Sequence, residues 1–207
     1  MNLTAELTTL IEQLEPIARP GGTGRVLMLM GSGKTVGTST IARELARLAA
    51  ARSARGVWLY DLAFGTNEQR RATRADGPVF DAGFGAPAFW ATGHPDEARL
   101  VARQSAVPRL FVSEFQSRQP VRGVSLRPAP DYWRHVRTAV DLAIIDVPGD
   151  TTAALALVGD MDGVFLVADE QSQAADRLVA RRKAIETRGG LVSGIVYNRI
   201  GRARSVA

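Results

Sequence analysis

The stretch MGSGKTVGTSTIA, residues 30–42, decides the fold of this chain. It lies between an apolar run, VLMLM (26–30), and a helical pattern, STIARELARLAAARSA (39–54). A buried strand followed by a glycine-rich loop that opens a helix is the arrangement in which backbone N–H groups cradle a phosphate. The stretch therefore predicts a P-loop at the start of an α/β domain.

The P-loop pattern G-x-x-x-x-G-K-[ST] fits this stretch in two registers. In the first, Gly33 and Lys34 are the glycine and lysine of the final triplet. The opening glycine would then be replaced by Met28, inside the apolar run, which leaves a loop too short to wrap a phosphate. Gly37 would also fall in the first helical turn, where glycine costs about 1 kcal/mol relative to alanine.

In the second register, Gly37, Thr38, Ser39 and Thr40 take the places of the final glycine, the lysine and the two hydroxyl residues. The loop then has its full length, so we favour this register. A P-loop lysine brings positive charge to the β- and γ-phosphates, whereas threonine brings only a hydroxyl. Ser39 would hold Mg²⁺, and Lys34 lies on the same loop as a substitute for the missing charge. The alternative interpretation is a strand-to-helix turn that binds no ligand.

The rest of the chain alternates apolar runs with helical patterns. Further strands are predicted at 56–61, 109–115, 142–146, 163–169 and 191–198, and helices at 131–140, 151–158 and 171–188. Continuous apolar runs are typical of strands buried on both faces of a parallel sheet. We therefore predict an α/β fold with a doubly wound, mostly parallel sheet flanked by helices, a three-layer αβα arrangement of the P-loop NTPase type.

Two segments stand apart from this alternation. Residues 1–20 predict a helical arm that packs on the domain or on a neighbour, and residues 21–207 a single P-loop NTPase-like domain. The apolar stripe of the arm consists of Leu3, Leu7, Leu10, Ile11 and Leu14. Residues 62–130 hold most of the prolines and many glycines, so we expect loops and short elements there.

Polar residues follow three of the predicted strands. Asp146 ends the run LAIID as a Walker B aspartate would, where it can hold Mg²⁺ or its water shell. Asp61 ends the second strand, as a further Mg²⁺ neighbour or a group that positions water. For both, the alternative is a carboxylate that caps the next turn. Asn198 and Arg199 end the last strand, where an asparagine amide can contact a base edge or form a turn.

Composition excludes several functional classes. The chain has 207 residues and no cysteine, which rules out disulfides and thiolate metal sites. No apolar run approaches the roughly 18 residues that span a bilayer. The net charge is +5, almost all of it from scattered arginines without interleaved aromatic residues, so we expect no nucleic-acid partner. We expect a cytoplasmic protein whose basic surface suits the anionic face of the inner membrane.

The order of these segments resembles the MinD/ParA-type deviant Walker ATPases. Within that group, the likeness is greatest to bacterial tyrosine kinases of capsule and exopolysaccharide synthesis, of the CpsD/CapB and Wzc cytoplasmic-domain type. The resemblance covers about residues 25–60 and 130–200 and rests on the order, the spacing and the D-x-x-I-I-D-x-P segment at 141–148.

The resemblance implies a role for each candidate residue. The loop 31–40 would face the phosphates of ATP or ADP, Ser39 and Asp146 would serve Mg²⁺, Asp61 would be the second Walker aspartate, and Asn198 would face adenine. Sequence differences from the family fall on the same functions: Thr38 replaces the loop lysine, and Ala63 replaces a second aspartate. The family's C-terminal tyrosine cluster and the Glu/Arg pattern of its N-terminal helix are absent.

Three functional hypotheses follow. The first is a degenerate kinase-like protein with weak or no ATP hydrolysis, acting as a regulatory partner of an inner-membrane polysaccharide copolymerase or polymerase. The family context allows peripheral membrane association and a homo-oligomer. The second is an active ATPase or tyrosine kinase of the same pathway that uses Lys34. The third is a positioning protein of the ParA or MinD type.

Overall fold

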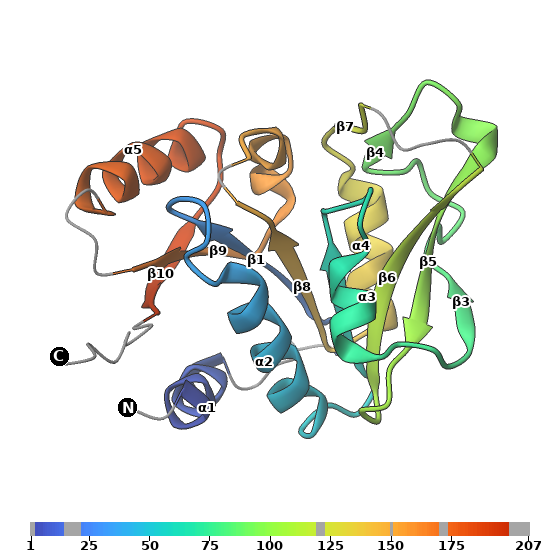
Figure 1. Cartoon of the computed structure of the whole chain (residues 1–207), viewed down its shortest axis with the longest axis horizontal. Helices are drawn as coiled ribbons and strands as arrows, with labels where there is room; N and C mark the ends of the chain where they lie inside the picture. The colour runs from blue at the N-terminus through green and yellow to red at the C-terminus, as the bar shows by residue number, and fades with distance from the viewer. Residues whose placement is uncertain (1–2, 15–21, 119–122, 150, 170–173, 199–207) are drawn as a thin grey trace, which may run out of the picture.

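The structure is a computed structural model that describes residues 3–14, 22–118, 123–149, 151–169 and 174–198. Its elements are α1 (Leu3–Leu14), β1 (Arg25–Gly31), α2 (Thr38–Ala50), β2 (Val57–Asp61), α3 (Glu68–Thr73), β3 (Val79–Asp81), β4 (Trp90–Ala91), η1 (Pro95–Glu97), β5 (Ala98–Gln104), β6 (Leu110–Ser117), β7 (Ser125–Leu126), α4 (Pro130–Ala139), β8 (Leu142–Val147), η2 (Ala153–Ala156), η3 (Val158–Asp160), β9 (Gly163–Ala168), α5 (Ala174–Glu186) and β10 (Val192–Tyr197). Figure 1 shows their arrangement.

One large sheet organises the molecule. Its strand order is β10-β9-β1-β8-β2-β6-β5-β3, and the six strands from β10 to β6 run parallel. Helices cover both faces: α4, η2 and α5 pack on one, and α1 and α2 on the other. This confirms the predicted three-layer α/β fold with a mostly parallel sheet.

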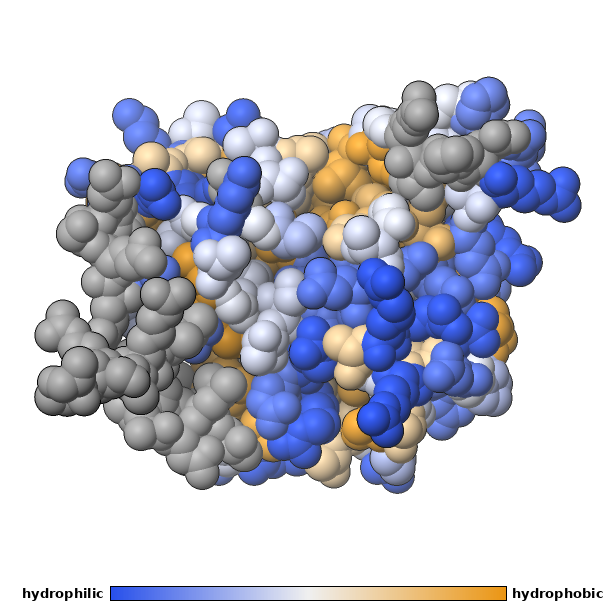
Figure 2. Space-filling view, in the orientation of Figure 1, coloured by the Kyte–Doolittle hydropathy of each residue, from blue (hydrophilic) through white to orange (hydrophobic). Residues whose placement is uncertain are grey.

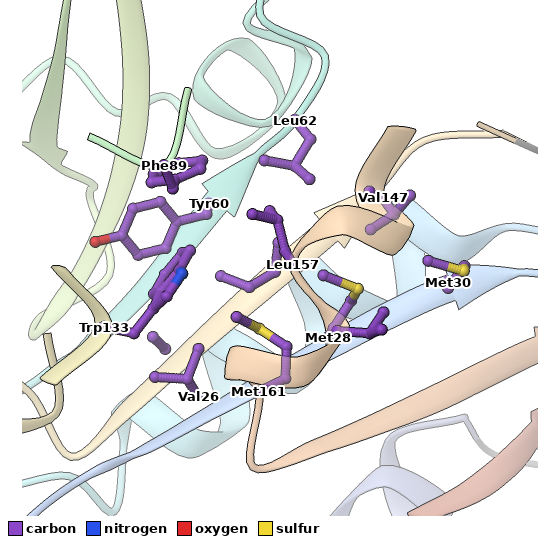
Figure 3. Packing of buried hydrophobic residues seen from close by; sticks show 14 of the residues in the cluster. Val26, Met28, Met30, Tyr60, Leu62, Phe89, Trp133, Val147, Leu157 and Met161 are labelled. Atoms are coloured by element: carbon purple, nitrogen blue, oxygen red, sulfur yellow. The ribbon is translucent and has the colours of Figure 1, made fainter. Parts of the chain in front are cut away.

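The central strands are buried on both faces because their sequences are continuously apolar. β1, β8 and β9 have at most one partly exposed residue each. On the α4 side, Tyr60, Phe89 and Trp133 form an aromatic group beside Met28 and Met161 (Figure 3). The ring centroids of Phe89 and Trp133 lie 4.8 Å apart. This rigid centre holds the carboxyl ends of the strands, where ligands bind in such sheets.

The N-terminal helix packs on the domain. Leu7 and Ile11 are each 1% exposed and belong to the apolar cluster that contains Ile41, Leu45 and Ala46 of α2. The part of the expected stripe whose side chains are described, Leu7, Leu10 and Ile11, therefore packs in the chain's own core. The part of the predicted arm from residue 15 to residue 20 lies outside the described residues.

The region 62–130 differs from the prediction in one element. α3, β3, β4, η1 and β7 are the expected short elements, but β5 is a seven-residue strand that pairs antiparallel with both β6 and β3. Its sequence, ARLVARQ, gives a weak strand signal because only three apolar residues, Leu100, Val101 and Ala102, are buried, between polar residues on both sides. Residues 151–158, expected as a helix, contain the short 3-10 segments η2 and η3 instead. Within the part of the chain that is described, every helix is too short or too polar to cross a membrane.

Candidate nucleotide site

The glycine-rich loop joins β1 to α2 with the length that the second register requires. β1 ends at Gly31 and α2 begins at Thr38. Gly37 caps the helix with a φ of 85°, a left-handed conformation that favours glycine. No side chain caps this helix, and no described residue accepts a hydrogen bond from the backbone N–H groups between Gly33 and Ser39. These N–H groups are therefore available to an anion.

Thr38 faces the inside of the loop. Its side chain is buried, and a Cβ atom added to Gly31 would lie 2.8 Å from the Thr38 Oγ1. The Thr38 hydroxyl therefore lies close to Gly31, at the start of the loop. Lys34 and Thr40 are exposed, and Lys34 extends from the other side of the loop.

Asp61 and Asp146 end neighbouring strands and form a register pair between β2 and β8. They are 3% and 1% exposed. The end of β8 lies beside the start of α2, since the Gln69 Nε2 contacts both Asp146 Oδ2 and the Ser39 carbonyl. The structure therefore brings together the loop and both aspartates that the sequence singled out.

A residue that sequence reasoning missed, Gln69, connects these groups. Its side chain is fully buried, and its Nε2 donates to Asp146 Oδ2 at 2.6 Å and to the Ser39 carbonyl at 2.8 Å. Its Oε1 accepts from Arg43 Nε at 3.0 Å. One neutral carboxamide thus joins the Walker-type aspartate to the first turns of α2. Nothing in the local sequence NEQRR signals this role, because the contacts come from three separate elements.

Asp61 uses both of its carboxylate oxygens to hold the chain that follows it. Oδ1 accepts from the Ala63 N–H and Oδ2 from the Gln69 N–H, each at 2.8 Å. These are the capping contacts that the sequence left open as the alternative role. Asp61 therefore positions Gln69, and its role as a catalytic group stays a prediction.

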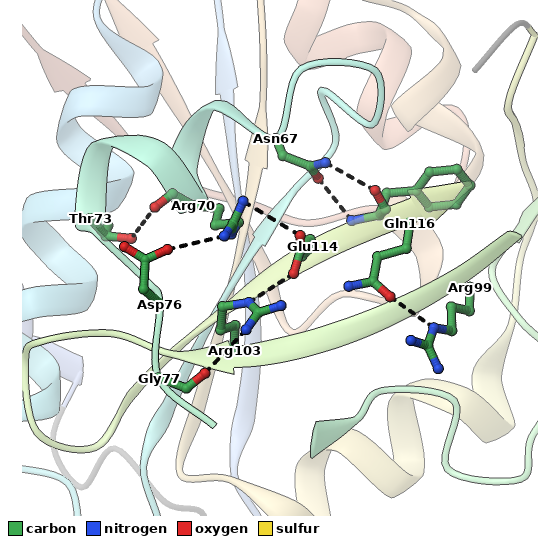
Figure 4. A network of polar contacts seen from close by, with 10 residues as sticks. Asn67, Arg70, Thr73, Asp76, Gly77, Arg99, Arg103, Glu114 and Gln116 are labelled. Carbon is green, nitrogen blue, oxygen red and sulfur yellow. Dashed lines mark hydrogen bonds and ion pairs between the residues drawn. The ribbon is translucent and has the colours of Figure 1, made fainter. Parts of the chain in front are cut away.

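The segment that carries Gln69 is fastened to β6 (Figure 4). The Asn67 side chain donates to the Phe115 carbonyl at 2.9 Å and accepts from the Phe115 N–H at 2.8 Å. Glu114 pairs with Arg103 at 2.8 Å and lies 3.6 Å from Arg70 of α3. Figure 2 shows hydrophilic residues gathered over α3 and the neighbouring strands. These contacts fix α3, and with it the Gln69 carboxamide.

The two buried aspartates have altered acidity. Burial raises the pKa of Asp146 to about 6, and the nearby Asp61 adds to this, while the Gln69 amide, the Ser39 hydroxyl and Arg43 act in the opposite direction. Burial also raises the pKa of Asp61, whereas the hydrogen bonds that its carboxylate accepts from the Gln69 and Ala63 N–H groups act to lower it. Asp146 Oδ1 has no hydrogen-bond partner among the described residues. An underused buried carboxylate of this kind is typical of a functional site.

The Mg²⁺ site expected at Ser39 and Asp146 stays a prediction. Mg²⁺ takes about six oxygen ligands at roughly 2.1 Å. Asp146 Oδ1 is buried without a hydrogen-bond partner among the described residues, and Oδ2 accepts the Gln69 amide. Within the described ranges there is also no group of three or more His, Asp or Glu side chains able to hold a metal.

Asn198 lies against the loop. Its Nδ2 donates to the Val36 carbonyl at 3.0 Å, and a Cβ atom on Gly37 would lie only 2.1 Å from it. Asn198 therefore supports the turn that ends in α2, and its expected contact with adenine stays a prediction. Arg199, the other nucleotide-contacting residue expected on this strand end, lies outside the described residues.

A pocket of about 610 Å³ opens on the other side of the loop. Its walls come from the loop, η2 and α5, and its lining residues are Ser32, Gly33, Lys34, Thr152, Leu155, Arg177, Ala180, Arg181 and Ala184. The Arg177 guanidinium reaches the loop, since a Cβ atom on Gly33 would lie 3.1 Å from its Nη1. Three cationic side chains thus line one cavity.

Comparisons with known proteins support the fold. No protein-family model matches the chain, and no curated protein matches it in sequence. Among solved structures, the kinase domain of Escherichia coli tyrosine kinase ETK aligns with 99% of this chain and 78% of its own, at a TM-score of 0.67 and 14% identity. Pyrococcus furiosus cell division ATPase MinD aligns with 87% of this chain and 74% of its own, at a TM-score of 0.63 and 15% identity.

A third structure, the VpsO kinase domain, aligns over 95% of this chain and 94% of its own, at a TM-score of 0.58 and 16% identity. The chain therefore has the fold shared by bacterial tyrosine kinase domains and MinD ATPases. This agrees with the resemblance read from the sequence.

Proposed function

We propose that this protein is a degenerate kinase-like P-loop protein that binds Mg²⁺–ATP weakly or not at all. It acts as a cytoplasmic regulatory partner of a bacterial exopolysaccharide or capsule synthesis and export machine. Its partner is an inner-membrane polysaccharide copolymerase or polymerase. The observation that carries this proposal is the hydrogen bond of 2.6 Å between the Gln69 amide and Asp146.

That contact supports the proposal because it occupies one of the two carboxylate oxygens of Asp146 within the protein. A Walker-type aspartate acts through a metal ion, which requires its oxygens to be accessible. Here a neutral donor takes one oxygen, and the carboxylate is almost completely buried. Asn67 and Asp61 fasten the segment that supplies this donor.

The loop supports the same conclusion independently. Thr38 puts a hydroxyl where phosphoryl transfer needs positive charge, and charge stabilisation of this kind contributes roughly 3–4 kcal/mol to a transition state. The polysaccharide pathway rests on the resemblance in sequence and on the kinase-domain fold. A protein that keeps this fold while losing the charged groups would act by docking.

Phosphate release from Mg²⁺–ATP tests the catalytic part of the proposal. We expect the parent protein to release phosphate no faster than Asp146→Ala, and calorimetry to give a Kd above about 1 mM, which is about −4 kcal/mol of binding free energy. Turnover that falls in both Asp146→Ala and Lys34→Ala would instead establish an active enzyme that uses Lys34.

A gain-of-function variant sharpens the test. Thr38→Lys combined with Gln69→Ala restores the charge and opens Asp146, so the double variant should bind Mg²⁺–ATP at least tenfold more tightly than either single variant. For the docking role, co-purification with the copolymerase of the same polysaccharide locus should be unchanged by Asp146→Ala. Loss of the association in that variant would show that docking needs the nucleotide site.

A further inference from the structure

The two edges of the large sheet differ in how well they are protected against pairing with another chain. β3, at one edge, has only three residues and ends with the charged Asp81. β10, at the other edge, has six residues, VSGIVY, which include neither a charged residue nor a proline. Short strands and charged side chains discourage pairing at an edge, whereas a longer uncharged strand favours it. β10 is therefore the edge that is open to a further strand.

The backbone of β10 has hydrogen-bonding groups on its open side. The Asn198 N–H, directly after the strand, donates to the Ala168 carbonyl of β9 at 2.8 Å. Because N–H and C=O groups alternate in direction along a strand, those of Ile195 and Tyr197 point away from β9. The bulge in β10 interrupts its register only between Val192 and Gly194. The second half of the strand thus presents regularly spaced donors and acceptors to a strand of another chain.

Exposed apolar side chains gather at the same edge. Ile195 is 44% exposed, Tyr197 is 54% exposed, and Leu191, just before the strand, is 63% exposed. Val196 packs against the apolar cluster of α1 and α2. Since neighbouring side chains point to opposite faces of a sheet, Ile195 and Tyr197 lie on the α5 face. Neighbouring exposed apolar side chains of this kind mark a surface for association.

One flank of α5 continues this surface. Ala180 and Ala184 line the pocket beside the loop, and helical spacing therefore puts Val179, Arg182 and Glu186 on the opposite flank, toward β10. Figure 1 shows α5 at the β10 end of the sheet. Val179 is 68% exposed, and Arg182 pairs with Glu186 at 2.7 Å. β10 and this flank thus carry no net charge, although the chain has a net charge of +5. An identical surface can therefore approach without charge repulsion.

We infer that two copies of this chain associate through β10, with the two strands antiparallel about a two-fold axis, so that the two sheets become one. A two-fold interface uses the same surface of both copies, and an edge strand supplies the donors and acceptors that its own copy needs. Ile195, Tyr197 and Val179 of both copies would share one apolar strip on the α5 face. A charged segment of another protein fits less well, because this edge offers no net charge to attract it.

This inference goes beyond the proposed function. Pairing through β10 uses neither Thr38 nor Asp146, and it requires neither a nucleotide nor a membrane partner. Phosphate release and copolymerase binding are measured separately from the oligomeric state. Failure of this inference is therefore distinguishable from failure of the proposed function.

Sedimentation equilibrium of the full chain tests the inference. We expect a monomer–dimer equilibrium that weakens at least about tenfold in Ile195→Lys, because this change puts like charges close together on two paired strands. Tyr197→Ser is a second, milder variant and should weaken dimerisation in the same direction. The matched control is Val79→Lys, since Val79 is 46% exposed on the opposite edge strand, and this variant should dimerise like the parent. Circular dichroism checks that each variant folds.

Three results of this experiment would overturn the inference. The first is a parent protein that stays monomeric up to about 0.5 mM, because a dimer with a Kd below 1 mM would be detected at that concentration. The second is a dimer that neither Ile195→Lys nor Tyr197→Ser weakens. The third is an equal loss of dimer in Val79→Lys.

Cysteine cross-linking tests the antiparallel arrangement. The chain has no cysteine, so cysteines introduced one at a time at positions 193–197 report only on contacts between copies. A two-fold axis places one position opposite itself, and a disulfide requires Cα atoms within about 7 Å of each other. We expect oxidation to cross-link one of these variants fastest and Val79→Cys slowly. Cross-linking at positions 193–197 that is no faster than in Val79→Cys would contradict pairing through β10.

Discussion

Two aspartates at opposite ends of the β8 segment have opposite environments. Asp141, just before the strand, accepts from the Ser53 hydroxyl, the Ala54 and Arg55 N–H groups and the Arg55 guanidinium at 2.7–2.9 Å. Partial burial acts to raise its pKa, but these hydrogen bonds outweigh that effect and lower the pKa to about 2. Asp146, at the other end, has one Gln69 donor, an unpartnered Oδ1 and a pKa of about 6.

The two aspartates therefore affect stability in opposite ways at the two ends of one strand. Asp141 is fully ionised at neutral pH and satisfied by its neighbours, so it stabilises the amino-terminal edge of the sheet. Asp146 is buried with too few donors, so its charged form destabilises the carboxyl edge. Structural strain of this kind is retained where a ligand site is or has been, at the edge where α/β folds bind ligands.

The largest expected effect on stability comes from removing the Asp141 carboxylate, whose hydrogen bonds are satisfied. Asp141→Ala should lower the free energy of unfolding by about 3 kcal/mol at pH 7, because four buried or half-buried donors lose their acceptor. The carboxylate's pKa is lowered from 3.8 to about 2, so its contribution is complete above pH 4 and is lost as pH falls toward 2. Urea unfolding at a series of pH values measures this. An unchanged difference between pH 7 and pH 2.5 would contradict it.

A smaller effect of opposite sign is expected at the other end. Asp146→Asn should raise the free energy of unfolding by about 2 kcal/mol at pH 8. Since the pKa of Asp146 is raised from 3.8 to about 6, the folded state is stabilised when the group is protonated and loses that stability as pH rises from about 4 to 6. The gain should therefore vanish near pH 4. Chemical denaturation of both proteins at pH 4 and pH 8 tests this, and a loss of stability at pH 8 would refute it.

The smallest expected effect concerns the support of the loop. Asn198→Ala removes the donor to the Val36 carbonyl and should cost about 1 kcal/mol. Ser53→Ala, at the satisfied end, removes a donor to Asp141 and an acceptor for the Gly56 N–H, so it should cost more. Thermal unfolding of the two variants side by side gives the order. A lower unfolding temperature for Asn198→Ala than for Ser53→Ala would contradict this prediction.

Local sequence was sufficient to predict the strands around the glycine-rich loop and the helix that follows it. The apolar runs ending at Met30 and at Ile145 predict strands buried on both faces, and the glycine at 37 marks the helix start that the structure has. Each of these signals lies within about ten residues. The aspartates at the strand ends follow from the rule that parallel strands place their carboxyl ends at one edge.

Contacts between distant segments could not be predicted in this way. Gln69 reaches Asp146 across 77 positions, and the arginines of α5 face a loop more than a hundred residues earlier. The hairpin of β5 and β6 is also difficult to predict, since β5 has only three buried apolar residues between Arg99 and Arg103. Local sequence patterns do not indicate which polar side chains point into the protein.

The position of the Gln69 carboxamide has a consequence for how such a protein evolves. Gln69 lies on α3 and contacts one oxygen of Asp146, whereas Thr38 is the first residue of α2. The two differences from the family therefore lie on different elements. Under the proposed function, a mutation that restores lysine at position 38 would leave Asp146 bound to Gln69, and one that removes Gln69 would free Asp146 beside a loop that still has threonine at position 38. Neither substitution alone would restore activity, so selection would favour neither one. The loss of activity would therefore be difficult to reverse.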